Sequence, residues 1–205
     1  MDHKKLNNKV EDLIIKIATL NDVNGIHFVL NQNLVKIKNI NELPDEKRKD
    51  LEDRGFLRKQ VDVEFYKDLI ERDNIEIYIA QDNNNIIGFA SIYKNQNNIR
   101  KIRDTSIILH INEKNDEALL IDKELNFVYL DQLSVIPDYQ HKGVATAILN
   151  KILEHISDPI ISFIVKVPLA NNASEKWHIF NNFKSIGTAE GIYKEKSFLW
   201  NVYRR

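Results

Sequence analysis

The stretch LDQLSVIPDYQHKGVATAILNKIL, residues Leu130–Leu153, decides the fold. An apolar run ends at Pro137, a short polar loop follows, and an apolar stripe with helical spacing begins after Gly143. The pattern predicts a strand over 127–135 and a helix over 144–156. A glycine there lets an anion approach the unpaired N–H groups and the positive dipole end of the helix. An ordinary strand-to-helix turn would explain the same glycine equally well.

The apolar run IISFIVKV, residues 160–167, follows the predicted helix. Such a run is typical of a strand covered on both faces, so 127–167 is expected to form a right-handed crossover between parallel strands. The loop has fewer glycines than a dinucleotide fingerprint and lacks the Gly-Lys-Ser/Thr of a P-loop. The expected ligand is therefore a phosphate-bearing molecule of another kind, with Gln140 and Lys142 as further candidate donors.

The remaining segments alternate between helical and strand-like patterns. Segment 39–60 is charged and interrupted by Pro44 and Gly55, so a loop with short helical pieces is expected. Segment 95–126 is long for a hairpin connection and is expected to be an inserted arm. In that arm RDTSIILHI is a strand or a short helix, and LLIDKEL could pair with it. The other expected elements are strand 11–18, a helix capped by Asn21 or Asp22 and ending near Asn33, helix 61–72, strands 75–80 and 86–94 around a turn at 82–85, helix 173–182, and two strands over 184–203.

Composition narrows the function class. The chain has 205 residues, a formal net charge of -1 and no cysteine, which excludes disulfides, thiolate metal sites and a cysteine nucleophile. The six histidines show no close metal-ligand pairing, so no metal is expected. The near-neutral charge gives no indication of nucleic acid, and no apolar run has the length of a membrane span. We expect a cytoplasmic protein, and the sequence leaves a homodimer open.

Two segments resemble one family. The pattern V-x-P-x-x-Q-x-x-G-x-A, Val135 to Ala145, resembles the acyl-CoA-binding motif of the GNAT N-acetyltransferase superfamily. NNASEKWHIFNNFKSIG, Asn171 to Gly187, resembles a segment of its phosphinothricin-type acetyltransferases, with Asn182 in place of a glycine. The resemblance implies a single α/β domain over 1–205 with the GNAT fold, a central mixed twisted sheet with a β-α-β acyl-CoA-binding core. The arm at 95–126, between the third and fourth strands, departs from the family, which has a short turn there.

The resemblance also implies how acetyl-CoA is held. In the family the pyrophosphate lies on the amides of the loop, and backbone groups of the preceding strand face the thioester. Asn171 would hold CoA or separate the strands, although it could equally cap a helix. The residues that the resemblance assigns to acetyl-CoA are Leu133, Ser134, Val135, Gln140, His141, Lys142, Gly143, Val144, Ala145, Thr146 and Asn171.

Two side chains are candidates for the chemistry. His178 takes the position of a tyrosine that in many family members protonates the leaving thiolate, and its ordinary pKa suits a proton donor. It could instead be a packing residue beside Trp177. Asp131 lies mid-strand among apolar residues, where an unpaired carboxylate is costly. It is a candidate base or ligand for the substrate ammonium, or else a carboxylate satisfied by backbone or a lysine. Tyr129 would share its face of the strand.

The implied activity is transfer of an acetyl group from acetyl-CoA to a primary amine by direct attack. A small molecule or an amino-acid-like compound is the favoured acceptor, and a protein amine remains open. A non-catalytic acyl-CoA-binding module is the alternative from another class, because the loop and Asn171 would serve binding alone. No metal takes part in either reading.

Overall fold

The computed structural model describes residues 13–35, 40, 42–96, 108–111, 126–193 and 196–205. The chain divides into two compact units. The first unit comprises 1–33, 61–91 and 132–156, and the second comprises 34–60, 92–131 and 157–205. Two long strands, β3 (Asn85–Gln96) and β5 (Phe127–Val135), pass from one unit into the other. The single domain with an arm at 95–126 stays a prediction.

The first unit contains the amino-terminal strands of the sheet, in the order β1-β2-β3-β5. β1 (Ile14–Ile17) pairs antiparallel with β2 (Ile75–Asp82). The predicted hairpin between β2 and β3 is confirmed, and its turn consists of Asn83 and Asn84 with φ of 49° and 64°. Asparagine tolerates this left-handed conformation, which two-residue hairpin turns require.

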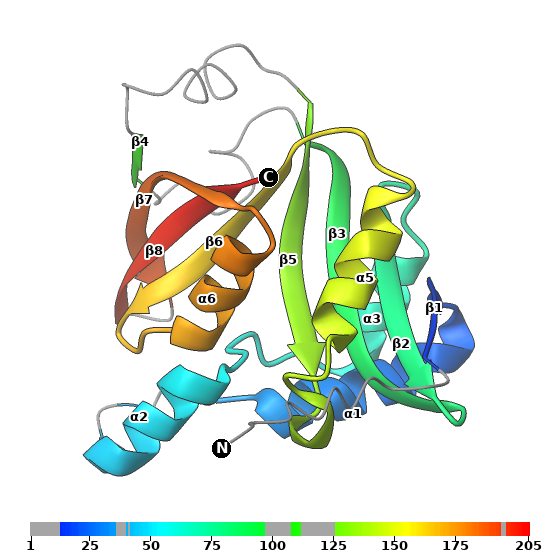
Figure 1. Ribbon diagram of the computed structural model, residues 1–205, viewed down its shortest axis with the longest axis horizontal. Helices are drawn as coiled ribbons and strands as arrows, with labels where there is room; N and C mark the ends of the chain where they lie inside the picture. Colours follow the sequence, from blue (N-terminus) through cyan, green and yellow to red (C-terminus); the bar gives the residue numbers. More distant parts are fainter. Residues whose placement is uncertain (1–12, 36–39, 41, 97–107, 112–125, 194–195) are drawn as a thin grey trace, which may run out of the picture. The chain divides into compact units, whose positions relative to one another are not determined.

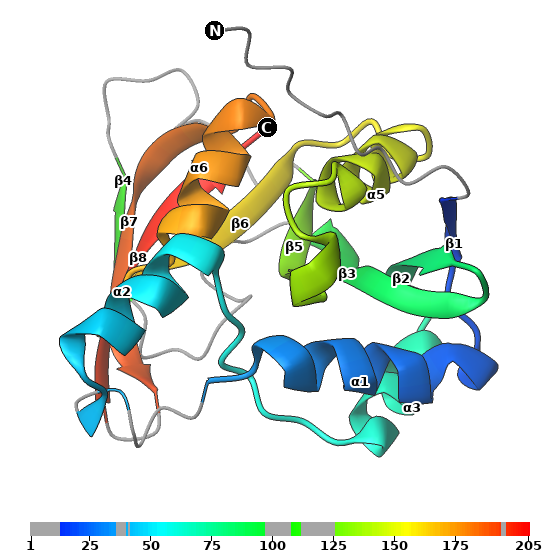
Figure 2. The same cartoon turned by 60° about the horizontal axis from the view of Figure 1, so that its bottom comes forward.

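Helices cover both faces of the sheet of the first unit. α1 (Val23–Asn33) and α3 (Val63–Ile70) lie on one face, and α5 (Val144–Leu153) lies on the other (Figures 1 and 2). α5 buries a stripe at helical spacing and ends three residues before the predicted boundary. Its buried residues are Val144, Ile148, Leu149 and Ile152.

The start of α1 differs in detail from the prediction. A short 3-10 turn, Leu20–Asp22, precedes the helix, and Thr19 is its N-cap. The Asp22 carboxylate accepts hydrogen bonds from the Thr19 backbone N–H at 2.8 Å and from its hydroxyl at 2.9 Å. Asp22 therefore completes a capping box, and neither Asn21 nor Asp22 is the cap residue itself.

The second unit contains the remaining strands in the order β5-β6-β8-β7-β4. β6 (Ile160–Val167) runs parallel to β5, as the crossover predicts, and its first six residues are buried. β7 (Lys184–Tyr193) and β8 (Lys196–Arg204) form the expected antiparallel pair. The core of this unit is aromatic and aliphatic. It includes Phe56, Phe127, Tyr129, Ile161, Phe163, Val165, Leu169, Ile186, Phe198, Trp200 and Val202.

Segment 39–60 is more ordered than predicted. α2 (Asp45–Arg54) is a ten-residue helix beside α6 (Asn172–Phe180), where a loop with short helical pieces was expected. Acidic residues in its first turn and Arg54 in its last turn complement the helix dipole. Gly55, with φ of 84°, ends it.

The arm contributes one described strand, β4 (Ile108–Ile111). It pairs antiparallel with β7, with Ile108 opposite Glu190. The described part of RDTSIILHI is thus a strand, one of the two forms expected for it. The predicted partner LLIDKEL lies outside the described residues.

Candidate functional site

The predicted site residues fall in both units. Leu133–Val135 and Gln140–Thr146 belong to the first unit, whereas Asp131, Asn171 and His178 belong to the second.

The loop between β5 and α5 exposes backbone. Gly143 is the N-cap of α5 and has φ of 84°, in the left-handed region that favours glycine. A Cβ added at Gly143 would meet no atom within 4 Å, so the space beside it is open. The first helical hydrogen bond runs from Ala147 N–H to the Gly143 carbonyl at 2.9 Å. The N–H groups of Val144 and Ala145 precede that bond, so this helix start can receive an anion.

The polar side chains of the loop have their own partners. Gln140 Nε2 donates to the Val135 carbonyl and to Asn33 Oδ1, both at 3.2 Å. The Lys142 ammonium lies 5.2 Å from the centre of the Tyr139 ring. The Gln140 amide therefore holds the end of β5, whereas the exposed Lys142 remains available as a phosphate donor.

Asn33, the last residue of α1, was not identified from the sequence. Its Nδ2 donates to Ser134 Oγ and to the Val135 carbonyl, both at 2.9 Å. More than 100 residues separate these partners along the chain, and no local sequence pattern indicates such a contact. Gly88 lies close by on β3, because a Cβ there would stand 3.1 Å from the Ser134 carbonyl oxygen.

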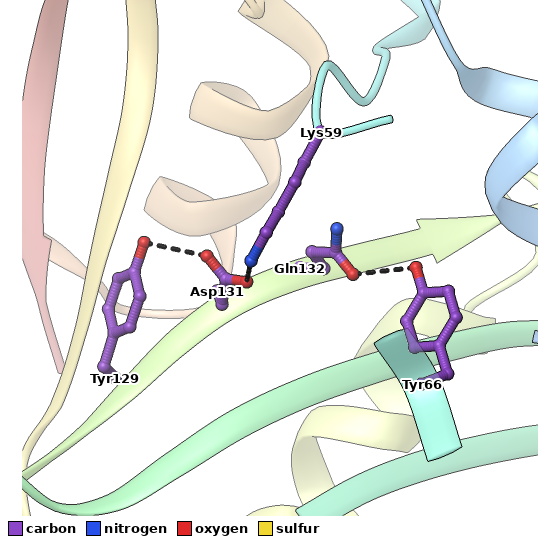
Figure 3. A network of polar contacts seen from close by, with 5 residues as sticks. All are labelled: Lys59, Tyr66, Tyr129, Asp131 and Gln132. Atoms are coloured by element: carbon purple, nitrogen blue, oxygen red, sulfur yellow. Dashed lines mark hydrogen bonds and ion pairs between the residues drawn. The ribbon is translucent and has the colours of Figure 1, made fainter. Parts of the chain in front are cut away.

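Asp131 carries a cationic partner in the second unit. The Lys59 ammonium lies 3.0 Å from one carboxylate oxygen, and the Tyr129 hydroxyl donates to the other at 3.1 Å (Figure 3). The Asp131 side chain is 11% exposed. Asp131 is therefore a carboxylate paired with a lysine, which was the structural alternative to a role as base or substrate ligand. Tyr129 lies on the same face of the strand, as expected.

Three residues that precede Lys59 in the chain, Phe56, Leu57 and Arg58, contact other parts of the second unit. The Phe56 carbonyl accepts from Asn171 Nδ2 at 3.0 Å, and the Leu57 carbonyl accepts from Val35 N–H at 2.8 Å. The Arg58 guanidinium stacks 4.3 Å from the centre of the Phe198 ring. These contacts fix the direction from which Lys59 reaches Asp131.

Asn171 caps α6. Its Oδ1 accepts from Ser174 N–H at 3.2 Å, while its Nδ2 donates to the Phe56 carbonyl. Its own backbone N–H donates to the Val165 carbonyl at 3.0 Å. Both ends of the side-chain amide are thus used inside the protein, which favours the helix-cap alternative over contact with CoA.

His178 is buried on α6. Its ring packs edge-to-face against Trp177 and Phe183 and at a tilt against Tyr203, with ring centres 4.8, 4.7 and 5.7 Å away. Burial lowers the pKa of His178 to about 4, although Nδ1 lies 2.7 Å from the Ser174 carbonyl.

The ring of His178 is therefore neutral at pH 7, and Nδ1 carries the proton because a carbonyl oxygen can only accept. Nε2 then has no proton to give, and it has no hydrogen-bond partner among the described residues. This state favours the packing alternative for His178 over the role of proton donor.

A buried amide follows Asp131 in β5. Gln132 is 3% exposed, and its Oε1 accepts from the Tyr66 hydroxyl at 3.0 Å within the first unit (Figure 3). Its Nε2 is buried without a partner among the described residues. No local sequence pattern singles out Gln132, because its partner Tyr66 lies on α3, 66 residues away along the chain.

Two further properties bear on the class of protein. In the described ranges, no group of three histidine, cysteine or acidic residues is placed to hold a metal ion. None of the helices in those ranges has the length and apolar character needed to cross a membrane.

Solved structures of low sequence identity share the fold. One from Streptococcus mutans, smu.2055, is 12% identical with a TM-score of 0.58, covering 94% of this chain and 98% of its own. Arabidopsis thaliana NAA60 in complex with acetyl-CoA is 14% identical with a TM-score of 0.57, covering 94% and 98%. PaiA N-acetyltransferase from Thermoplasma acidophilum in complex with coenzyme A is 14% identical with a TM-score of 0.53, covering 92% and 97%.

The family match is the stronger finding. No curated protein sequence matches the chain. The model of the acetyltransferase (GNAT) family matches residues 39–179, more than half of the 205-residue chain. The mixed sheet with its parallel β5-α5-β6 unit confirms the predicted fold class. Closeness to phosphinothricin-type members is not established. The chain belongs to the GNAT family of acetyltransferases.

Proposed function

We propose that this protein is an acetyl-CoA-dependent N-acetyltransferase that acts on the primary amine of a small-molecule or amino-acid-like acceptor. The observation that carries the proposal is the open space beside Gly143, at the start of α5. It coincides with the segment 135–145 that resembles the family's acyl-CoA motif. The pyrophosphate of acetyl-CoA would lie on the loop amides, within the set Gln140–Thr146.

The thioester would lie along the end of β5. Backbone N–H groups of Leu133–Val135 would face the carbonyl oxygen and stabilise the negative charge that develops on it as the amine attacks. Ser134 and Val135 are both buried, so this part of the strand is packed inside the protein. A fixed donor stabilises the transition state without a reorganisation cost.

Asp131 would receive the ammonium group of the acceptor. An amine attacks only after it loses a proton, and a buried carboxylate is a suitable group to accept it. The Lys59 ammonium already occupies the carboxylate at 3.0 Å, which supports an affinity of this position for cationic nitrogen. The choice of a small amine rests on the resemblance of 171–187 to phosphinothricin-type members.

The leaving thiolate takes a proton at the end of the reaction. His178 was the predicted donor, yet its Nδ1 bonds the Ser174 carbonyl and its ring is neutral at pH 7. We therefore assign this proton to water and assign His178 a packing role. His178→Ala tests this assignment, because a packing role predicts a loss of stability without a selective loss of kcat.

Release of free thiol from acetyl-CoA tests the activity. The panel contains amino acids, small amines and peptides with free amino termini, and each acceptor is measured with wild type and with Asp131→Asn. We expect turnover of at least one small amine and a fall of at least about tenfold in kcat/KM for Asp131→Asn. Preferential turnover of peptides would assign a protein acceptor instead.

Thermal unfolding with and without acetyl-CoA distinguishes a protein that binds acetyl-CoA without catalysis from one that does not bind it. Acetyl-CoA at 100 times its Kd should stabilise the fold by about 2.7 kcal/mol. Stabilisation with no thiol release above background for any amine would support the non-catalytic binding module. No stabilisation at all would refute binding of acetyl-CoA.

A further inference from the structure

Asn33 uses nearly all of its hydrogen-bonding capacity on the loop and the strand before it. Its amide has two N–H donors, which go to Ser134 Oγ and to the Val135 carbonyl at 2.9 Å each. Its oxygen accepts from Gln140 Nε2 at 3.2 Å. Gln140 then donates a second time, to the same Val135 carbonyl, at 3.2 Å. The four residues form a closed network.

The orientation of both amides follows from this network. A backbone carbonyl oxygen only accepts, so the nitrogen atoms of Asn33 and Gln140 must both face Val135. The oxygen of Asn33 must then face Gln140. A reversed amide at either position would place two acceptors against each other, so the network has one low-energy arrangement.

The network joins three elements at the start of the loop. Asn33 ends α1, Val135 ends β5, and Gln140 lies three residues before Gly143. The Gln140 backbone N–H also donates to the Pro137 carbonyl at 3.1 Å. The loop is thereby held from the end of β5 to Gln140, while the space beside Gly143 is open.

We propose that Asn33 is a positioning residue for acetyl-CoA. It holds the strand end and Gln140 in the geometry that presents the loop amides to the phosphates, and it does not contact the phosphates itself. The affinity for the cosubstrate therefore depends on the end of α1, an element outside the motif. This inference rests on the proposed function.

Calorimetry of CoA binding, with kinetics of acetyl-CoA turnover, tests the proposal. Asn33→Ala should raise the Kd for CoA and the KM for acetyl-CoA about tenfold, because the freed loop must be ordered on binding. The kcat should change by less than about twofold. Asn31→Ala is the matched control, because Asn31 lies on the same helix but is exposed, and among the described residues its side chain bonds only to His27, within α1. It should leave both constants unchanged.

A second variant and a shortened donor distinguish positioning from general destabilisation. Asn33→Ala combined with Gln140→Ala should lose less affinity than the product of the single losses, because both act through one network. Turnover of S-acetylpantetheine, which lacks the phosphates, should change by less than about twofold in Asn33→Ala. An equal loss with this donor, or multiplicative losses in the double variant, overturns the proposal.

The outcomes also separate this inference from the proposed function. Tight CoA binding by wild type with equal binding by Asn33→Ala refutes the inference alone. No CoA binding by wild type refutes both.

Discussion

The two segments that resemble family motifs use their polar groups in opposite ways. In 135–145 the loop before α5 leaves open space beside Gly143, at the start of the helix. In 171–187 two polar side chains are used inside the protein, with Asn171 capping α6 and His178 buried among aromatic rings. The difference teaches that a motif residue can belong to a family pattern either for its contact with ligand or for the packing of its own helix.

The largest expected effect concerns the loop before α5, at Gly143. Gly143→Glu should lower the affinity for CoA by more than about 100-fold, because it adds bulk and negative charge where phosphate is expected. A glutamate at this position would also be strained, because the backbone has a positive φ of 84°. Calorimetry with CoA measures the loss. Gly143→Asn is the control, since asparagine adopts positive φ without adding charge. Unchanged CoA affinity in Gly143→Glu would sink the phosphate assignment.

The next largest effect concerns His178, which is buried in the segment 171–187. His178→Ala should lower the free energy of unfolding by about 3 kcal/mol, because it leaves a cavity among aromatic rings. At temperatures where the variant is folded, its kcat should stay within about twofold of wild type. His155→Ala is the control, because His155 makes the same bond to a carbonyl four residues earlier, at 2.9 Å, but is exposed. A selective loss of kcat would return His178 to the role of proton donor.

The protonation of His178 gives a pH dependence. Its pKa is lowered by burial to about 4, whereas in the unfolded chain it is about 6.5. Between these values the unfolded state binds more protons, so stability falls as pH decreases from about 6.5 towards 4. The loss should be up to about 3 kcal/mol, and urea unfolding across this pH range measures it. The difference between wild type and His178→Phe isolates this group, and parallel curves would contradict its buried neutral state.

The smallest effect sharpens the assignment of Asn171. Asn171→Ala should lower the free energy of unfolding by about 1–2 kcal/mol through loss of the cap and of the bond to Phe56. The affinity for CoA should stay within about twofold of wild type. Asn172→Ala, one residue further along, removes no cap and should be nearly neutral. A large loss of CoA affinity in Asn171→Ala would restore the interpretation of Asn171 as a CoA ligand.

Local patterns predicted the centre of the fold. β5 begins and ends at the predicted residues, and the parallel pairing with β6 follows from the apolar run at 160–167. The apolar residues of these elements recur in regular patterns within short windows, and such patterns are the main indication of secondary structure in a single sequence. α2 lacked the signal because DEKRKDLEDR has one apolar residue, Leu51, and no buried face. The helix is stabilised instead by charges that complement its dipole at both ends and by its contact with α6.

Partners distant in sequence could not be predicted. Lys59 reaches Asp131 across 72 residues, and Asn33 reaches Gln140 across 107. The sequence indicated that Asp131 needs a partner, because an unpaired buried carboxylate is costly. It could not choose among the 29 lysines and arginines. Asn33 gave no signal at all, since an asparagine at a helix end is ordinary.

The strand β4 has a consequence for solubility. An uncovered strand edge offers unpaired N–H and C=O groups to any other chain, which makes long edges sites of aggregation. β4 pairs with four of the ten residues of β7, from Gly187 to Glu190. Short edge strands resist the addition of further strands. β4 thus covers part of β7 with a strand of four residues, so the removal of β4 would expose Gly187–Glu190 to intermolecular pairing.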